Sequence, residues 1–76
     1  MLVKKIGETI KKRRKELKIT QIQVAEQAKI NINTLYKLER GLTNPTLEVL
    51  GKLLEVLEMK IELSVKNDGE EFLSLK

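Results

Sequence analysis

The sequence predicts a mainly α-helical domain that ends in a short β-strand or hairpin. Apolar residues recur every three or four positions through residues 2–58, which is the spacing of a buried helix face. After Glu58 the spacing changes to two, which is typical of a half-buried strand. A chain of 76 residues suits one hydrophobic core. We therefore expect a helical unit over residues 1–59 and a strand extension of the same domain over residues 60–76.

The first helix is expected over residues 2–17, because apolar side chains at helical spacing form one stripe there. The stripe consists of Val3, Ile6, Ile10 and Leu17.

Two short helices are expected next, over residues 21–28 and 32–39. Thr20 and Gln23 fit a capping box at the start of the first, and Asn31 can cap the second. The inward residues are Val24, Ala25, Leu35 and Leu38, and Gly41 supplies the stop. Helices this short are marginal in isolation and must pack on a scaffold. Such a pair with a polar second helix is the pattern of a helix-turn-helix motif, whose second helix lies in the DNA major groove.

The fourth helix is expected over residues 45–58. Asn44 reads as its cap, and Pro45 as its first helical residue, where proline is well tolerated. Its buried stripe is predicted to be Leu47, Leu50, Leu54 and Leu57, widened by Val49 and Leu53.

The C-terminal residues predict one or two strands. Residues 61–65 alternate apolar and polar, Asn67-Asp68-Gly69 favours a turn, and residues 71–75 could form a second strand. The strands could pair with each other or with another chain. Because a lone two-stranded ribbon is marginally stable, we expect a second copy to complete it. The expected dimerisation residues are Ile61, Leu63, Val65, Phe72 and Leu73.

A charged pair is predicted inside the helical core. Arg14 falls on the stripe of the first helix, and Glu39 stands four residues after Leu35, near the buried face of the third. A buried charge without a partner is strongly unfavourable, whereas an arginine–carboxylate pair satisfies both groups. We therefore expect Arg14 and Glu39 to join these two helices. The alternative is that both lie outside the core in water.

Composition narrows the class of function. The net charge of +4 is uneven, because residues 1–19 carry +6 and the remaining residues −2. Such a basic segment is either a solvated lysine-rich face or a surface that faces phosphate, and beside a helix-turn-helix we favour the second. Cysteine and histidine are absent, so we expect no thiolate metal site, no cofactor and no enzymatic activity. Neither a membrane span nor a signal peptide is recognisable, so we expect a cytoplasmic protein.

Residues 6–58 resemble the Xre/Cro group of helix-turn-helix domains. The residues that carry the resemblance are Thr20-Gln21, Val24-Ala25, Leu35, Leu38-Glu39-Arg40-Gly41 and Pro45. It implies a four- or five-helix DNA-binding domain that acts as a homodimer on a near-palindromic operator, with Arg14 paired to Glu39. Lys29 departs from the group, which usually has glycine there, at a position expected to need a left-handed backbone.

The resemblance also assigns the residues expected to contact double-stranded DNA. Residues matching the base-reading positions are Asn31, Ile32, Asn33, Tyr36 and Lys37. Gln21 matches a phosphate-binding glutamine at a helix N-terminus. Further phosphate contacts are expected from Arg40, Thr43 and Asn44, with Lys12 and Arg13 adding charge at the rim. Two of these have alternatives, because Ile32 could pack inside and Tyr36 could be an aromatic at the core edge.

The tail carries a second resemblance. Residues 45–65 look like HipB-type antitoxins, in which the fourth helix leads into a strand that pairs across the dimer. That resemblance implies an alternative function, an antitoxin that neutralises a HipA-type toxin and represses its own operon. A purely protein-binding module is a further alternative. The sequence favours a DNA-binding transcriptional regulator, most simply a repressor, with no small-molecule ligand expected.

Overall fold

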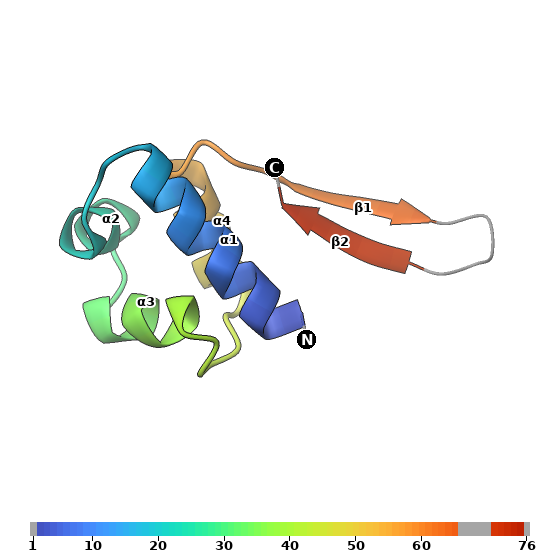
Figure 1. Ribbon diagram of the computed structural model, residues 1–76, viewed down its shortest axis with the longest axis horizontal. Helices are drawn as coiled ribbons and strands as arrows, with labels where there is room; N and C mark the ends of the chain where they lie inside the picture. Colours follow the sequence, from blue (N-terminus) through green and yellow to red (C-terminus); the bar gives the residue numbers. More distant parts are fainter. Residues whose placement is uncertain (1, 66–70, 76) are drawn as a thin grey trace.

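The structure is a computed structural model, and it describes residues 2–65 and 71–75. These residues form four helices and two strands (Figure 1). In chain order they are α1 (Leu2–Glu16), α2 (Gln21–Ala28), α3 (Ile32–Glu39), α4 (Leu47–Val56), β1 (Ile61–Val65) and β2 (Glu71–Leu75). The helices gather into one body, and the two strands project from it as a ribbon. The expected fold class is confirmed.

The core lies between the four helices. α1 packs against α3, α2 packs against both α3 and α4, and each helix contributes apolar side chains. The side chains that are completely enclosed are Ile10, Val24, Leu35, Leu38, Leu53 and Leu57. All six were predicted from the sequence to lie inside: Ile10 in α1, Val24 in α2, Leu35 and Leu38 in α3, and Leu53 and Leu57 in or directly after α4. In the described part of the chain, no helix has the length and apolar character needed to cross a bilayer.

The starts of α2 and α3 follow the predicted caps. The Thr20 hydroxyl accepts a hydrogen bond from the backbone N–H of Gln23 at 3.1 Å, and the Gln23 side-chain oxygen accepts one from the backbone N–H of Thr20 at 2.9 Å. The Asn31 side-chain oxygen accepts from the backbone N–H of Asn33 at 2.7 Å. These bonds satisfy amides that the helix itself leaves without acceptors.

The start of α4 differs from the prediction. Thr46, and not Asn44, is the cap, because its hydroxyl accepts from the backbone N–H of Val49 at 3.1 Å. Pro45 therefore lies before the helix. Leu47, predicted as a core residue, is the first residue of α4 and is 79% exposed. Both Asn and Thr are good caps, and the structure uses the later one.

All four helices end in the same backbone motif. A residue one or two positions after each helix is left-handed, with φ of 57° at Lys18, Lys29 and Glu58 and 72° at Gly41. The next amide then bonds a carbonyl five residues back, as Ile30 does to Ala25 at 3.0 Å. This is the Schellman arrangement, which favours glycine. The left-handed backbone expected at Lys29 is confirmed, and a side chain there costs on the order of 1 kcal/mol.

The two strands pair within the chain. They are antiparallel, with Ile61 opposite Leu75 and Leu63 opposite Leu73. The base of the ribbon is anchored, since Met59, Ile61 and Leu75 are partly buried against the helical core. The predicted turn at Asn67-Asp68-Gly69 lies outside the described residues, and so do the side chains of residues 63–65 and 71–74.

The left-handed residues yield a stability prediction. Lys29→Gly is expected to raise the free energy of unfolding by about 0.5 to 1 kcal/mol, because relief of left-handed strain exceeds the added entropy of glycine in the unfolded chain. Urea unfolding followed by circular dichroism measures it. The matched control is Lys11→Gly, within α1 at an exposed site, which should lower stability by about 1 kcal/mol. A loss of stability in both variants would contradict the interpretation.

Candidate nucleic-acid interface

The position of α3 is set first by a close approach to α1. At Gly7 in α1, an added Cβ would overlap the carbonyl oxygen of Leu38 and lie 3.2 Å from the carbonyl carbon of Glu39. The backbones of the two helices therefore touch, which only glycine permits. Gly7 was not among the residues predicted from the sequence to position the site. Its signal was a glycine beside Ile6 on the buried face of a helix, a pattern that indicates close packing.

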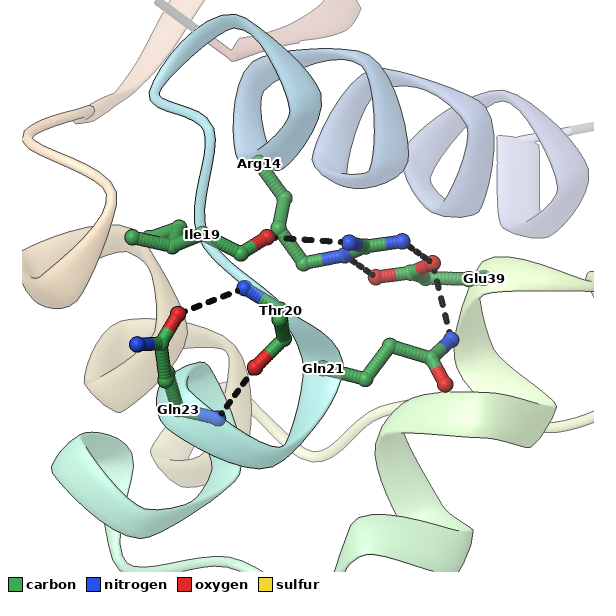
Figure 2. A network of polar contacts seen from close by, with 6 residues as sticks. All are labelled: Arg14, Ile19, Thr20, Gln21, Gln23 and Glu39. Atoms are coloured by element: carbon green, nitrogen blue, oxygen red, sulfur yellow. Dashed lines mark hydrogen bonds and ion pairs between the residues drawn. The ribbon is translucent and has the colours of Figure 1, made fainter.

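Arg14 and Glu39 meet at the C-terminal end of α3 (Figure 2). Arg14 Nε donates to Glu39 Oε2 at 2.7 Å and Nη2 donates to Oε1 at 2.9 Å, so the pair is bidentate. Arg14 Nη1 also donates to the carbonyl oxygen of Ile19 at 3.0 Å. The side chain of Arg14 is 12% exposed and that of Glu39 is 2% exposed. The contact is the one that the spacing predicts, and it belongs to the strong class of charge-assisted hydrogen bonds.

The Arg14 guanidinium keeps its charge near neutral pH. The hydrogen bond to Glu39 raises the pKa of the Arg14 guanidinium, burial opposes this, and the carboxylate charge adds to the rise. When folding raises the pKa of a basic group, its charged form stabilises the fold at every pH below the unfolded-state pKa. This stabilisation is lost only as the pH rises through the folded-state pKa. Since both lie far above neutrality for arginine, we expect no loss from Arg14 deprotonation near neutral pH.

Gln21 joins the same network. Its Nε2 donates to Glu39 Oε1 at 3.0 Å, so the first residue of α2 is tied to the last residue of α3. Figure 2 shows Arg14 and Gln21 converging on Glu39 from different helices. The sequence predicted Gln21 as a phosphate contact, and that role stays a prediction. The bond to Glu39 was not foreseen. It fixes α2 relative to α3, which is the geometry that a helix-turn-helix needs.

The outward side of α3 carries most of the predicted base-reading residues. Asn33, Tyr36 and Lys37 are exposed, and the last two lie three and four positions after Asn33, which puts them on one side of the helix. Arg40, a predicted phosphate contact, is exposed at the residue that follows α3. The Arg40 guanidinium lies over the Tyr36 ring, 5.3 Å from its centroid, at cation–π distance.

The remaining predicted DNA-contact residues lie around this side. Ile32 is 38% exposed, so the alternative that it packs inside is wrong. Asn31 is exposed although it caps the helix, Asn44 is exposed, and Thr43 is half-buried.

Next to α3 lies a shallow hollow with basic and apolar walls. It is formed by the C-terminal end of α1 and the starts of α2 and α3, and its walls include Lys15, Lys18, Ile22 and Ile32. Ile22 is 59% exposed. Ile22 was not among the residues predicted from the sequence to lie inside the fold or to contact DNA. The hollow opens beside the N-terminus of α2, whose backbone amides favour an anion.

The expectation that Arg13 adds charge at the rim needs correction. Arg13 Nε donates to the carbonyl oxygen of Leu57 at 3.0 Å, and its other nitrogens lie 3.7 Å from Glu16 and 3.8 Å from Glu58. Consecutive helical residues point about 100° apart, so Arg14 faces α3 while Arg13 faces the end of α4. Its guanidinium is therefore directed toward the end of α4 and not toward α3. Lys12 remains exposed on α1.

The fold and this arrangement define a helix-turn-helix protein, and comparison with known proteins agrees. The family model described as Helix-turn-helix matches residues 10–63, which include α2, α3 and α4. The chain therefore belongs to the helix-turn-helix family, and the Xre-type resemblance is confirmed. The HipB-type resemblance of the tail is not confirmed.

The chain is also similar to a phage protein. It is 38% identical over 68 residues to the immunity repressor protein of Bacillus phage phi105. The match covers 90% of this chain and 45% of that protein, so the chain spans less than half the length of this relative.

The network around Glu39 yields the second prediction. Glu39→Ala is expected to lower the free energy of unfolding by about 3 to 5 kcal/mol, because the Arg14 guanidinium loses its buried counter-ion. Glu39→Gln keeps one acceptor oxygen and should lose less. Chemical denaturation measures both.

The control is Lys52→Ala, which breaks the exposed Lys52–Glu48 pair at 3.5 Å. This change should cost no more than about 0.5 kcal/mol. An equally small effect of Glu39→Ala would show that the network does not hold the fold.

Proposed function

We propose that the chain is a sequence-specific DNA-binding transcriptional repressor that acts as a homodimer on a near-palindromic operator. The observation that carries the proposal is the outward polar side of α3, held in place by the network around Glu39. Family membership and the similarity to an immunity repressor support it. Repression then follows from occupancy, since a dimer bound across a promoter excludes the polymerase.

The proposed base contacts come from the start and outward side of α3. The Asn31 and Asn33 amides suit the paired donor and acceptor of adenine, and Lys37 suits the acceptors of guanine. Ile32, exposed at the start of α3, suits a thymine methyl group. Tyr36 lies under the Arg40 guanidinium. We propose that its ring faces the groove wall and holds Arg40 toward the DNA.

Phosphate contacts are proposed around this reading surface. Gln21 at the start of α2 and the segment Arg40–Asn44 after α3 flank the outward side of α3, where they would meet the backbone on either side of the groove. Lys15 and Lys18 beside the α2 N-terminus add charge. Such contacts orient the protein without reading sequence.

We propose that the ribbon is the dimerisation element. Its base packs on the helical core, while the rest projects away from it (Figure 1). A two-stranded ribbon is marginally stable without further partners. A second ribbon, paired through Ile61, Leu63, Val65, Phe72 and Leu73, would supply them. Two α3 helices would then lie about one DNA turn apart, roughly 34 Å.

The other candidate functions gain no support. The antitoxin alternative rests on the tail, and the similar protein found is a phage repressor. Proteins of this family act by binding and are not typically enzymes, so we propose no catalytic activity. The expected location is the cytoplasm, where the DNA is.

Lys37 provides the sharpest test of the reading surface. Lys37→Ala is expected to weaken binding to a selected operator by roughly 1 to 3 kcal/mol, about 5- to 150-fold. Fluorescence anisotropy over a range of salt concentrations measures affinity and salt slope together. A base-reading lysine should leave the slope nearly unchanged, whereas a phosphate-binding lysine should reduce it by about one. Lys52→Ala on α4, also exposed, is the matched control. Unchanged affinity in Lys37→Ala would remove Lys37 from the interface.

Deleting residues 60–76 tests the dimer. Light scattering after size exclusion should show a dimer for the full chain at micromolar concentration and a monomer for the truncated one. The truncated chain should bind an isolated half-site as the full chain does, because the helices that read DNA remain. Circular dichroism checks that it is folded. A monomeric full chain, or a truncated chain that is still dimeric, would refute dimerisation through the ribbon.

A further inference from the structure

Arg13 and Arg14 are neighbours in sequence, yet they connect α1 to different parts of the structure. Arg14 binds Glu39 at the end of α3, and Arg13 binds the carbonyl oxygen of Leu57 at the end of α4. One turn of α1 therefore contacts both the helix that would read DNA and the segment that leads to the ribbon. The more extensive helix contacts join α1 to α3, and α2 to both α3 and α4. The Arg13 hydrogen bond adds a direct polar contact between α1 and the end of α4.

The contact is well placed to hold the end of α4. Leu57 is the C-terminal cap, and carbonyl groups there have no partners within the helix. A cation at a helix C-terminus is also favoured by the helix dipole. Arg13 is 31% exposed along its side chain, and Glu16 and Glu58 lie on either side of its guanidinium. At 3.7 and 3.8 Å these ion pairs are weak, so the 3.0 Å hydrogen bond to Leu57 is the main restraint.

The chain leaves for the ribbon immediately beyond this contact. Glu58 takes the left-handed conformation, and the Met59 amide donates to the carbonyl oxygen of Leu54 at 2.8 Å. β1 begins at Ile61. Since so few residues separate Leu57 from β1, the Arg13 contact restrains the backbone from which the ribbon starts. The apolar packing of the ribbon base on the helical core acts beside it. A rotation of the backbone at this point therefore changes the direction of the whole ribbon relative to the helices.

Direction matters because a dimer reads two half-sites at once. Adding one base pair between half-sites moves them apart by about 3.4 Å and rotates one about the DNA axis by roughly 35°. A ribbon that is fixed relative to α3 accepts one spacing, whereas a ribbon that swivels at its base accepts several.

We infer that Arg13 is a positioning residue, which holds the base of the ribbon at a fixed angle to α3 and thereby sets the half-site spacing that the dimer accepts. The inference rests on the proposed dimerisation through the ribbon. It assigns Arg13 no contact with DNA.

The test combines DNA spacing with a distance measured in the protein itself. Arg13→Met keeps an aliphatic side chain and removes the guanidinium that donates to Leu57. Arg13→Lys keeps a positive charge and an ammonium group that can donate a hydrogen bond. Lys12→Met is the matched control, because it removes one charge from the adjacent exposed position. Each variant is titrated with one isolated half-site and with operators whose half-sites are separated by the preferred spacing or by one base pair more or less. Circular dichroism confirms that each is folded.

The wild-type protein is expected to lose at least about tenfold in operator affinity when the half-site spacing changes by one base pair. Arg13→Met should reduce this loss to roughly threefold or less, with half-site affinity unchanged within about twofold. Arg13→Lys should restore part of the discrimination. Lys12→Met should keep the wild-type spacing preference, with any loss of affinity equal for the half-site and for each full operator. A purely structural role would lower stability without altering spacing preference.

The second readout does not depend on DNA. The chain has no cysteine, so cysteines introduced at Gln27 and Ser64 give two unique sites for spin labels, measured in an excess of unlabelled protein. Arg13→Met should broaden the distance distribution between them, and Lys12→Met should not. The inference is overturned if Arg13→Met leaves the distance distribution unchanged. It is also overturned if the distance distribution broadens but the preference for one half-site spacing stays the same. If the wild-type protein is monomeric, the proposed dimer is wrong and so is the role of Arg13 in half-site spacing. The distance measurement still decides whether Arg13 fixes the direction of the ribbon.

Discussion

The carboxylate of Glu39 is the group on which the arrangement of the helices depends. Its side chain is 2% exposed and accepts hydrogen bonds from Arg14 on α1 and Gln21 on α2. A carboxylate enclosed in this way is strongly unfavourable unless its oxygens are satisfied. Among the described residues, no buried side-chain polar atom lacks a hydrogen-bond partner. The buried Glu39 carboxylate is therefore tolerated only when α1, α2 and α3 are arranged so that Arg14 and Gln21 reach it. In this way the carboxylate specifies the arrangement of the three helices.

A polar clamp suits a helix that must leave much of its surface for a ligand. α3 has 8 residues and buries only Leu35, Leu38 and Glu39. Two leucines supply burial energy but little directional preference, because apolar contacts tolerate sliding and rotation. The bidentate pair and the backbone contact at Gly7 add direction. We interpret the network as the device that orients the outward side of α3, with Arg13 performing a similar task for the ribbon.

The features that could be predicted from the sequence are those governed by nearby residues. The Thr20–Gln23 capping box, the Asn31 cap and the left-handed Lys29 follow from short patterns whose bonds span a few positions. The Arg14–Glu39 pairing could also be predicted, because a charge on a buried stripe requires a partner and the sequence offers few. The site residues on α3 followed from the resemblance, and their roles toward DNA remain proposals.

The features that could not be predicted depend on distant geometry. Asn44 and Thr46 are both competent caps, and only the packing of α4 chooses between them. Leu47 has the spacing of a core residue but lies at the edge of the packed body. The partners of Gln21 and Arg13 are 18 and 44 positions away in sequence, so no local pattern indicates them. Such contacts arise from the assembled fold.

The central claim is that the interaction between Arg14 and Glu39 itself, and not merely the volume of the two side chains, holds α3 on α1. A double-mutant cycle measures this most directly, with Arg14→Met, Glu39→Leu and the double variant compared by chemical denaturation. We expect each single change to be strongly destabilising and the double variant to be much less so than their sum, with a coupling energy of about 2 to 3 kcal/mol. Additive effects, with a coupling below about 0.5 kcal/mol, would contradict the account.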